Sequence, residues 1–225
     1  MYKIAVFDMD GTILDTIDDL HAAINHTLKN LGFPERGRDE FRTFIGDGQR
    51  ILVKRSLPEG AQDGETLQRV IDLYAPYYAA HADILTTIYD GVFEAIAKMR
   101  EAGMKIAIFT NKPHAPAVAL AEKYFPGMID FVFGQRADIP RKPDPAGLFV
   151  ILDEFQIPKE ECIYIGDSDV DMLTAKNAGV DAIGVTWGYC TREEIENAGG
   201  RVIVDNSSNL LDLVLGGREM LHAVK

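Results

Sequence analysis

The chain has 225 residues, of which 47% are hydrophobic and 26% charged, and its formal net charge is −12. This composition is typical of a folded protein of one or two domains and excludes a wholly disordered, collagen-like or coiled-coil chain. The acidic balance argues against non-specific nucleic-acid binding, which needs basic patches. An acidic protein that handles anions must concentrate positive charge locally, often as a metal ion.

Cysteine content and hydropathy indicate a cellular location. Cys162 and Cys190 are too few for a disulfide framework and lack metal-ligand spacing, so we expect buried thiols. The first apolar stretch meets Asp8 too early for a signal peptide. No run approaches the roughly 18 apolar residues that a membrane helix needs. We therefore expect a cytoplasmic protein with neither a membrane nor a nucleic-acid partner.

Short apolar runs alternate with amphipathic stretches along most of the chain. The apolar runs predict strands at residues 3–8, 104–109, 129–133, 161–165, 181–185 and 201–204. The amphipathic stretches between them predict helices at residues 91–102, 114–124, 144–154 and 169–178. This alternation predicts an α/β fold with a doubly wound, parallel, Rossmann-like sheet covered by helices on both faces.

One long gap interrupts this alternation. A strand–helix unit needs about 30 residues, which leaves about 65 surplus residues between the first and second predicted strands. The surplus contains helical patterns at residues 17–31, 38–44, 49–57 and 66–80. We predict a helical cap of residues 16–81, inserted after the first strand of a catalytic core that comprises residues 1–15 and 82–225. The alternative is a set of extra helices packed on the same core.

Polar motifs follow four predicted strands in succession. The motifs are Asp8-Met9-Asp10-Gly11-Thr12, Thr110-Asn111-Lys112, Arg141-Lys142-Pro143-Asp144-Pro145 and Gly166-Asp167-Ser168-Asp169-Val170-Asp171. Each alone has a structural explanation, such as a capped turn, a surface lysine or a charged helix start. Ligand sites of open α/β sheets form outside the carboxyl ends of strands, so the joint occurrence of these motifs predicts one site there.

In order and spacing, the motifs DMDGT, FTN, KPDP and GDSDVD resemble those of haloacid dehalogenase superfamily phosphatases. The resemblance spans residues 8–171, and the helical insert lies where one cap class of that family places it. Two further segments, FIGDGQRILVKRSL in the cap and VTWGY after the fifth strand, resemble the phosphoglycolate phosphatase subgroup.

The resemblance implies four catalytic residues. Asp8 matches the nucleophile, which takes the phosphoryl group as an aspartyl phosphate. Asp10 matches the general acid and base. Thr110 matches the residue whose hydroxyl holds a phosphoryl oxygen, and Lys142 matches the lysine that stabilises nucleophile and phosphate. The aspartate at position 10 also favours phosphate chemistry over carbon–halogen cleavage, because the dehalogenases of the superfamily lack it.

The resemblance also implies a Mg²⁺ cofactor held by Asp8, the backbone carbonyl of Asp10 and Asp167, with Asp171 supporting it. Charge supports this assignment independently. The four carboxylates sum to −4, and a proton on Asp10, one Mg²⁺ and Lys142 bring that sum to zero, so a phosphate dianion can enter. Mg²⁺ is a hard cation that suits carboxylates, phosphate and water.

Substrate contacts are expected from both parts of the chain: Gly11 and Asn111 in the core, and Gly48, Arg50 and Lys54 in the cap. Residues 46–55 carry a local charge of +2, and a cationic side chain there would recognise a second anionic group on the substrate. The alternative is an amphipathic helix with a solvated basic face.

The sequence thus predicts a Mg²⁺-dependent phosphatase of a small phosphorylated metabolite, with 2-phosphoglycolate as the preferred substrate by resemblance. A sugar-phosphate phosphatase or phosphomutase and an inorganic pyrophosphatase of the same superfamily stay open. A non-catalytic regulatory or binding protein is the alternative from another class, and the complete motif set argues against it. Monomer and homodimer both stay open, as do the roles of His114 and Trp187.

Overall fold

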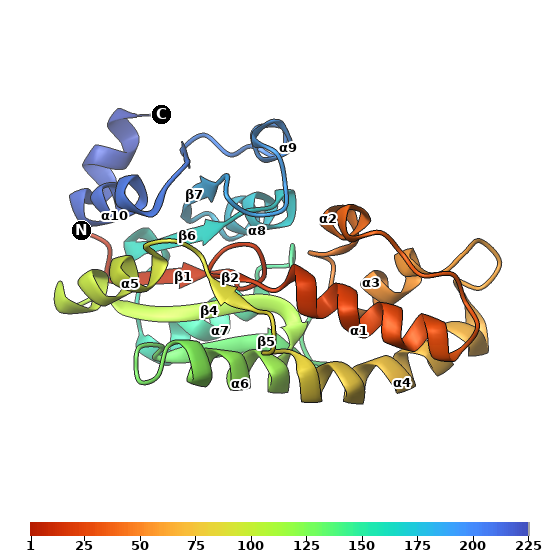
Figure 1. The fold of residues 1–225 in the computed structure, drawn as a ribbon. Coiled ribbons are helices and arrows are strands. Elements are labelled where there is room, and N and C mark those ends of the chain that lie inside the picture. Colours follow the sequence, from red (N-terminus) through yellow and green to blue (C-terminus); the bar gives the residue numbers. More distant parts are fainter. Residues whose placement is uncertain (225) are drawn as a thin grey trace.

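The computed structural model describes residues 1–224, and a parallel sheet of six strands forms its centre (Figure 1). In chain order these strands are β1 (Ile4–Phe7), β4 (Lys105–Pro113), β5 (Phe131–Gln135), β6 (Cys162–Gly166), β7 (Asp181–Val185) and β8 (Ile203–Val204). Their order across the sheet is β5-β4-β1-β6-β7-β8. The strand order therefore reverses beside β1, and the carboxyl end of β1 lies where open α/β sheets bind ligands.

Helices cover both faces of this sheet. They are α5 (Val92–Glu101), α6 (His114–Tyr124), α7 (Ala146–Phe155), α8 (Asp169–Ala178), α9 (Arg192–Asn197) and α10 (Ser207–Ala223), with a short 3₁₀ turn, η2 (Lys159–Glu161), before β6. Successive strand residues point to opposite faces. Phe7 of β1 thus packs in one hydrophobic cluster with Val92 of α5, whereas Val6 packs in another with Leu148 of α7. Burial on both faces explains why the strands are continuous apolar runs.

The predicted fold class is confirmed, and each predicted strand and core helix is present with its ends shifted by a few residues at most. Two further strands, β2 (Leu14–Asp15) and β3 (Thr87–Ile88), pair antiparallel where the chain leaves and re-enters the core. Strands of two residues carry no readable alternation. Helices α9 and α10 were also not predicted, and α10 is interrupted by non-helical backbone at Gly217, which obscures its periodicity.

The segment between β2 and β3 is helical. It contains α1 (Ile17–Asn30), the 3₁₀ turn η1 (Arg38–Glu40), α2 (Phe41–Phe44), α3 (Gln49–Ser56) and α4 (Gly64–His81). Figure 1 shows these elements together at one end of the molecule, with α1 beside α4 and both chain termini on the opposite side. Their apolar side chains form a hydrophobic cluster separate from the two on the sheet. The division into a cap of residues 16–81 and a core stays a prediction, which this separate cluster supports.

Among the helices of residues 1–224, none is long and apolar enough to cross a lipid bilayer.

Candidate active site

The sheet brings the four polar motifs together at one edge. Asp8 directly follows β1, Thr110 lies near the carboxyl end of β4, Lys142 lies in the loop after β5, and Asp167 directly follows β6. All four side chains are buried. The strands are parallel, so their carboxyl ends share an edge, and residues far apart in sequence meet there.

Asp8 lies in a crowded, buried environment. Its Oδ1 accepts a hydrogen bond from the backbone N–H of Met9 at 2.7 Å and lies 2.9 Å from the Nζ of Lys142. Burial raises the pKa of Asp8 to about 7, with Lys142 opposing the rise and Asp171 and Asp10 adding to it. Removal of the Asp8 carboxylate from water therefore outweighs the stabilising charge of Lys142.

Lys142 is held between two carboxylates. Its Nζ lies 2.7 Å from Asp171 Oδ1 and 2.9 Å from Asp8 Oδ1, and it donates to the hydroxyl of Tyr164 at 3.2 Å. Burial alone would lower the pKa of Lys142, but the two carboxylates outweigh it and raise that pKa. Lys142 is therefore a fixed positive charge beside the nucleophile that the motifs predict.

Asp171 orients Lys142 from the first turn of α8. Its Oδ2 accepts from the backbone N–H of Ser168 at 3.1 Å and from the Ser168 hydroxyl at 2.6 Å. The Ser168 Oγ accepts in turn from the Asp171 N–H at 3.2 Å, which makes a reciprocal helix cap. Both carboxylate oxygens of Asp171 thus have protein partners, and its direct contribution to a metal stays a prediction.

A group of three buried carboxylates has the composition of a divalent cation site. Asp8, Asp167 and Asp171 each offer an oxygen, and these oxygens lie within 4.8 Å of one another. Asp167 is oriented by the Thr12 hydroxyl and by the backbone N–H of Tyr189, each at 2.8 Å. Burial, followed by the charges of Asp171 and Asp8, raises the pKa of Asp167 well above its usual range. Crowded hard oxygen donors of this kind fit Mg²⁺, which relieves their mutual repulsion.

Two glycines allow close approaches around these carboxylates. Gly11 has φ +87°, and a Cβ there would collide with the carboxylate of Asp167. Gly48 in the cap has φ +83°, and its Cβ would lie 2.7 Å from Gln135 Oε1 and 3.1 Å from the carbonyl oxygen of Asn111. Both positions need a residue without a side chain. Gly11 thus lies beside Asp167 and Gly48 lies beside Asn111, and the contact of either glycine with substrate stays a prediction.

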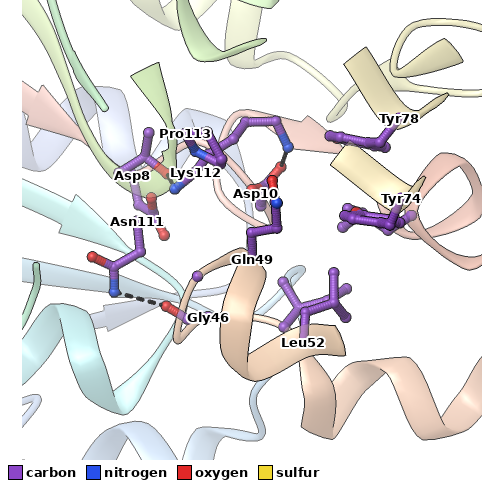
Figure 2. A pocket seen from close by; sticks show the side chains of 14 residues that line it. Asp8, Asp10, Gly46, Gln49, Leu52, Tyr74, Tyr78, Asn111, Lys112 and Pro113 are labelled. Carbon is purple, nitrogen blue, oxygen red and sulfur yellow. Dashed lines mark hydrogen bonds and ion pairs between the residues drawn. The ribbon is translucent and has the colours of Figure 1, made fainter. Parts of the chain in front are cut away.

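The cap loop that precedes α3 rests on the core motifs. The Asn111 side chain donates to the carbonyl of Gly46 at 2.9 Å, and Arg141 donates to the carbonyl of Asp47 at 2.5 Å. A cavity lies between the two parts (Figure 2), lined by Asp8, Asp10, Leu20, Ile45, Gly46, Gly48, Gln49, Leu52, Tyr74, Tyr78, Thr110, Asn111, Lys112 and Pro113. The volume of the cavity that the centre of a water molecule can occupy is about 40 Å³. This volume holds a few water molecules.

Lys112 was not predicted as a site residue, yet its side chain is only 1% exposed and lies in this cavity. Its Nζ is 2.7 Å from Asp10 Oδ1, an oxygen that also accepts from the Thr16 hydroxyl at 2.7 Å. The ammonium lies 4.9 Å from the centre of the Tyr78 ring. The sequence contained a pattern that indicates a site position for Lys112. Residues two apart in a strand point to the same face of the sheet, and Lys112 follows the predicted catalytic residue Thr110 at that spacing.

The structure does not bring Arg50 or Lys54 to the cavity. Arg50 is exposed and donates to Gln68 on α4 at 3.2 Å, and Lys54 pairs with Asp63 at 3.0 Å. Helical geometry explains the difference, because Gln49 and Leu52 of α3 line the cavity. Arg50 follows Gln49 by one residue and Lys54 follows Leu52 by two, so both lie on other sides of the helix. This placement disagrees with the expected substrate contacts and favours the alternative of a solvated basic face.

His114 and Trp187 have structural partners. The backbone N–H of Gly134 donates to His114 Nδ1 at 3.3 Å, and Trp187 Nε1 donates to the carbonyl of Thr12 at 3.0 Å. Neither residue lines the cavity. Trp187 thus braces the loop that carries the first motif.

The chain is similar in sequence and in structure to known phosphatases and related hydrolases. The family model of haloacid dehalogenase-like hydrolases matches residues 5–185. The phosphoglycolate phosphatase of Vibrio parahaemolyticus is 32% identical over an alignment of 222 residues, and the match covers 94% of this chain and 96% of that protein. A solved structure of a presumed phosphoglycolate phosphatase from Lactobacillus delbrueckii subsp. bulgaricus has a TM-score of 0.90 at 34% identity, covering 96% of this chain and 99% of that one. CbbY from Rhodobacter sphaeroides, solved in complex with phosphate, has a TM-score of 0.80 at 25% identity, covering 99% and 100%.

The chain therefore belongs to the haloacid dehalogenase-like hydrolases. Within that family it is a phosphoric monoester hydrolase that resembles phosphoglycolate phosphatases.

Proposed function

We propose that the protein is a Mg²⁺-dependent phosphatase that hydrolyses 2-phosphoglycolate through an aspartyl-phosphate intermediate. The observation that carries the proposal is the buried Asp8 carboxylate, paired with Lys142 at 2.9 Å and facing a cavity that Asp10, Thr110 and the cap share. The names of the curated relatives support the choice of substrate.

In the first half of the reaction, Asp8 attacks phosphorus and the bond from phosphorus to the ester oxygen breaks. Asp10 donates a proton to the departing alkoxide, which leaves as glycolate. The Thr110 hydroxyl donates to a phosphoryl oxygen, and Lys142 neutralises charge on Asp8 and on the transferred group. The products of this half are glycolate and a phosphorylated Asp8.

In the second half, a water molecule attacks the phosphorus of the aspartyl phosphate and Asp10 takes its proton. The bond from phosphorus to the Asp8 oxygen breaks, which releases inorganic phosphate and regenerates the carboxylate. In this proposal the cap opens between turnovers to admit substrate and release products, and opening breaks the hydrogen bond from Asn111 to the carbonyl of Gly46. We propose that residues 16–81 move as a unit about the β2–β3 pair, which joins them to the core.

Mg²⁺ would be held by Asp8 and Asp167, with the backbone carbonyl of Asp10 and with Asp171 in support. When bound, it would neutralise charge on the phosphoryl group. With Asp10 protonated as the general acid, the other three carboxylates (Asp8, Asp167 and Asp171) and the two lysines Lys112 and Lys142 carry a formal charge of −1. One divalent cation would change this charge to +1, which favours entry of the substrate dianion.

The size and lining of the cavity favour a small substrate. Leu20, Leu52 and Tyr74 form an apolar wall from three cap helices, and the small volume of the cavity favours a short carbon chain. The cytoplasm is the proposed location, since Cys162 and Cys190 are both free thiols.

The test is a screen of the purified protein against a panel of phosphate esters, with and without Mg²⁺. The panel contains 2-phosphoglycolate, a neutral aryl phosphate, sugar monophosphates and bisphosphates, and pyrophosphate. We expect the highest kcat/KM with 2-phosphoglycolate and no turnover in EDTA. A higher kcat/KM with a sugar phosphate or with pyrophosphate would reject the proposed substrate, and full turnover in EDTA would reject the proposed metal dependence.

A further inference from the structure

The cavity contains two polar groups that the proposed mechanism does not use. Lys112 is the sole lysine or arginine among the residues that line it within the described part of the chain. The hydroxyl of Tyr78, which comes from α4 of the cap, is buried and has no hydrogen-bond partner among residues 1–224. Figure 2 shows Lys112 reaching Asp10 on the side of the cavity where Tyr78 lies.

Both groups are costly to bury in this state. A lysine ammonium has three donors, and in residues 1–224 the one acceptor of Lys112 Nζ is Asp10 Oδ1. The Tyr78 ring adds a cation–π contact at 4.9 Å. An unpaired buried hydroxyl loses its bonds to water without replacement. Two ammonium donors and one hydroxyl are therefore available to a polar ligand.

The chemistry of the substrate indicates which ligand this is. In 2-phosphoglycolate a single methylene separates the ester oxygen from the carboxylate. Asp10 must approach the ester oxygen to protonate it, and Lys112 Nζ lies 2.7 Å from Asp10. A cation that contacts the general acid is therefore within reach of a carboxylate one methylene from the leaving oxygen.

We propose that Lys112 and Tyr78 form the subsite that binds the substrate carboxylate, an inference that rests on the proposed phosphatase function. Lys112 bridges Asp10 and the carboxylate, and the Tyr78 hydroxyl donates to the carboxylate when the cap closes. The subsite unites a core residue with a cap residue, so only a closed cap presents both donors. Arg50 and Lys54 take no part, because their partners are Gln68 and Asp63.

The experiment compares each acid substrate with a neutral partner of similar size. The first pair is 2-phosphoglycolate and 2-hydroxyethyl phosphate, and the second is 2-phosphoglycerate and glycerol 2-phosphate. The variants are Lys112→Met, which keeps a long apolar chain, and Tyr78→Phe, which removes only the unpaired hydroxyl. Arg50→Ala is the matched control for loss of a cap cation. The acid-to-neutral ratio of kcat/KM is measured on one preparation, so the fraction of folded protein cancels.

We expect Lys112→Met to lower this ratio by about 10- to 150-fold, the range for a hydrogen bond to a charged group. Most of the loss should appear as a higher KM for the acid, because the contact is already made in the ground state. Tyr78→Phe should lower the ratio by roughly 2- to 12-fold, and Arg50→Ala should leave it unchanged.

Equal losses on the acid and its neutral partner would overturn the subsite and assign Lys112 to positioning Asp10. A ratio unchanged in Lys112→Met would overturn it as well. If 2-phosphoglycerate is preferred over 2-phosphoglycolate and its ratio collapses in Lys112→Met, the subsite stands and the proposed substrate falls. A wild-type protein that prefers neither acid over its neutral partner would overturn the subsite.

Discussion

The Asn111 side chain donates a hydrogen bond of 2.9 Å to the backbone carbonyl of Gly46, and so connects the second core motif to the cap loop. The same side chain also accepts from the backbone N–H of Lys142 at 2.8 Å and donates to its carbonyl at 3.2 Å. One amide thus bonds both to the closed cap and to the backbone of the lysine beside Asp8. Cap closure and the alignment of Lys142 therefore depend on a shared residue.

Replacing this residue should affect both properties. Asn111→Ala removes three hydrogen bonds, and we expect kcat to fall at least about 10-fold because Lys142 and the cap loop lose their common anchor. The free energy of unfolding should fall by about 1–3 kcal/mol, since buried backbone groups lose partners. Steady-state kinetics and urea unfolding measure the two effects. Asn177→Ala is the control, because the exposed Asn177 also bonds the loop after β5, at the carbonyl of Pro143, and should change kcat little.

The nucleophile is tested by Asp8→Asn. The amide is nearly isosteric but cannot act as the attacking carboxylate, so we expect kcat to fall at least about 1,000-fold. The fold should persist, since Lys142 keeps its ion pair with Asp171 at 2.7 Å. Circular dichroism checks the fold, and mass spectrometry of trapped protein checks for a phosphoryl adduct in the wild type alone. Substantial turnover by a sequence-verified variant would contradict the covalent mechanism.

The metal site is tested by thermal shift. Mg²⁺ at about 100 times its Kd should stabilise the wild-type protein by about 2.7 kcal/mol, because it binds only the folded carboxylate group. Asp167→Asn should lose most of this shift, whereas Asp169→Asn, an exposed neighbour of the site, should keep it. The shift is measured within each variant, so differences in basal stability do not enter. An undiminished shift in Asp167→Asn would place the metal elsewhere.

A pH effect on stability is expected from Asp130, away from the site. Partial burial acts to raise the pKa of Asp130, but the Ile106 N–H, Lys105 and Arg100 outweigh it and hold that pKa below its usual value. A carboxylate with a lowered native pKa contributes stability above its unfolded pKa and loses it as the pH falls. Asp130→Asn should therefore have a lower Tm than the wild type at pH 7, and the gap should narrow toward pH 3. A difference in Tm that stays constant with pH would show that Asp130→Asn destabilises the protein through altered packing and not through loss of the carboxylate charge.

The sequence determined the sheet and the residues at its edge. Three site residues lie within or just beyond the end of a strand that the apolar runs predicted: Asp8, Thr110 and Asp167. Lys142 lies in the loop that follows another of these strands. Covalent connectivity and the shared edge of parallel strands then bring them together, so their convergence needs no knowledge of side-chain packing.

Only the tertiary structure decided how the cap meets this edge. The rotation of α3 directs Leu52 into the cavity and leaves Arg50 exposed, and a local charge count carries no information on that rotation. The pairing of Lys112 with Asp10 and the approach of Tyr78 likewise depend on docking α4 against the core. These contacts join segments whose relative placement is set by packing between two hydrophobic clusters, and no local pattern encodes that placement.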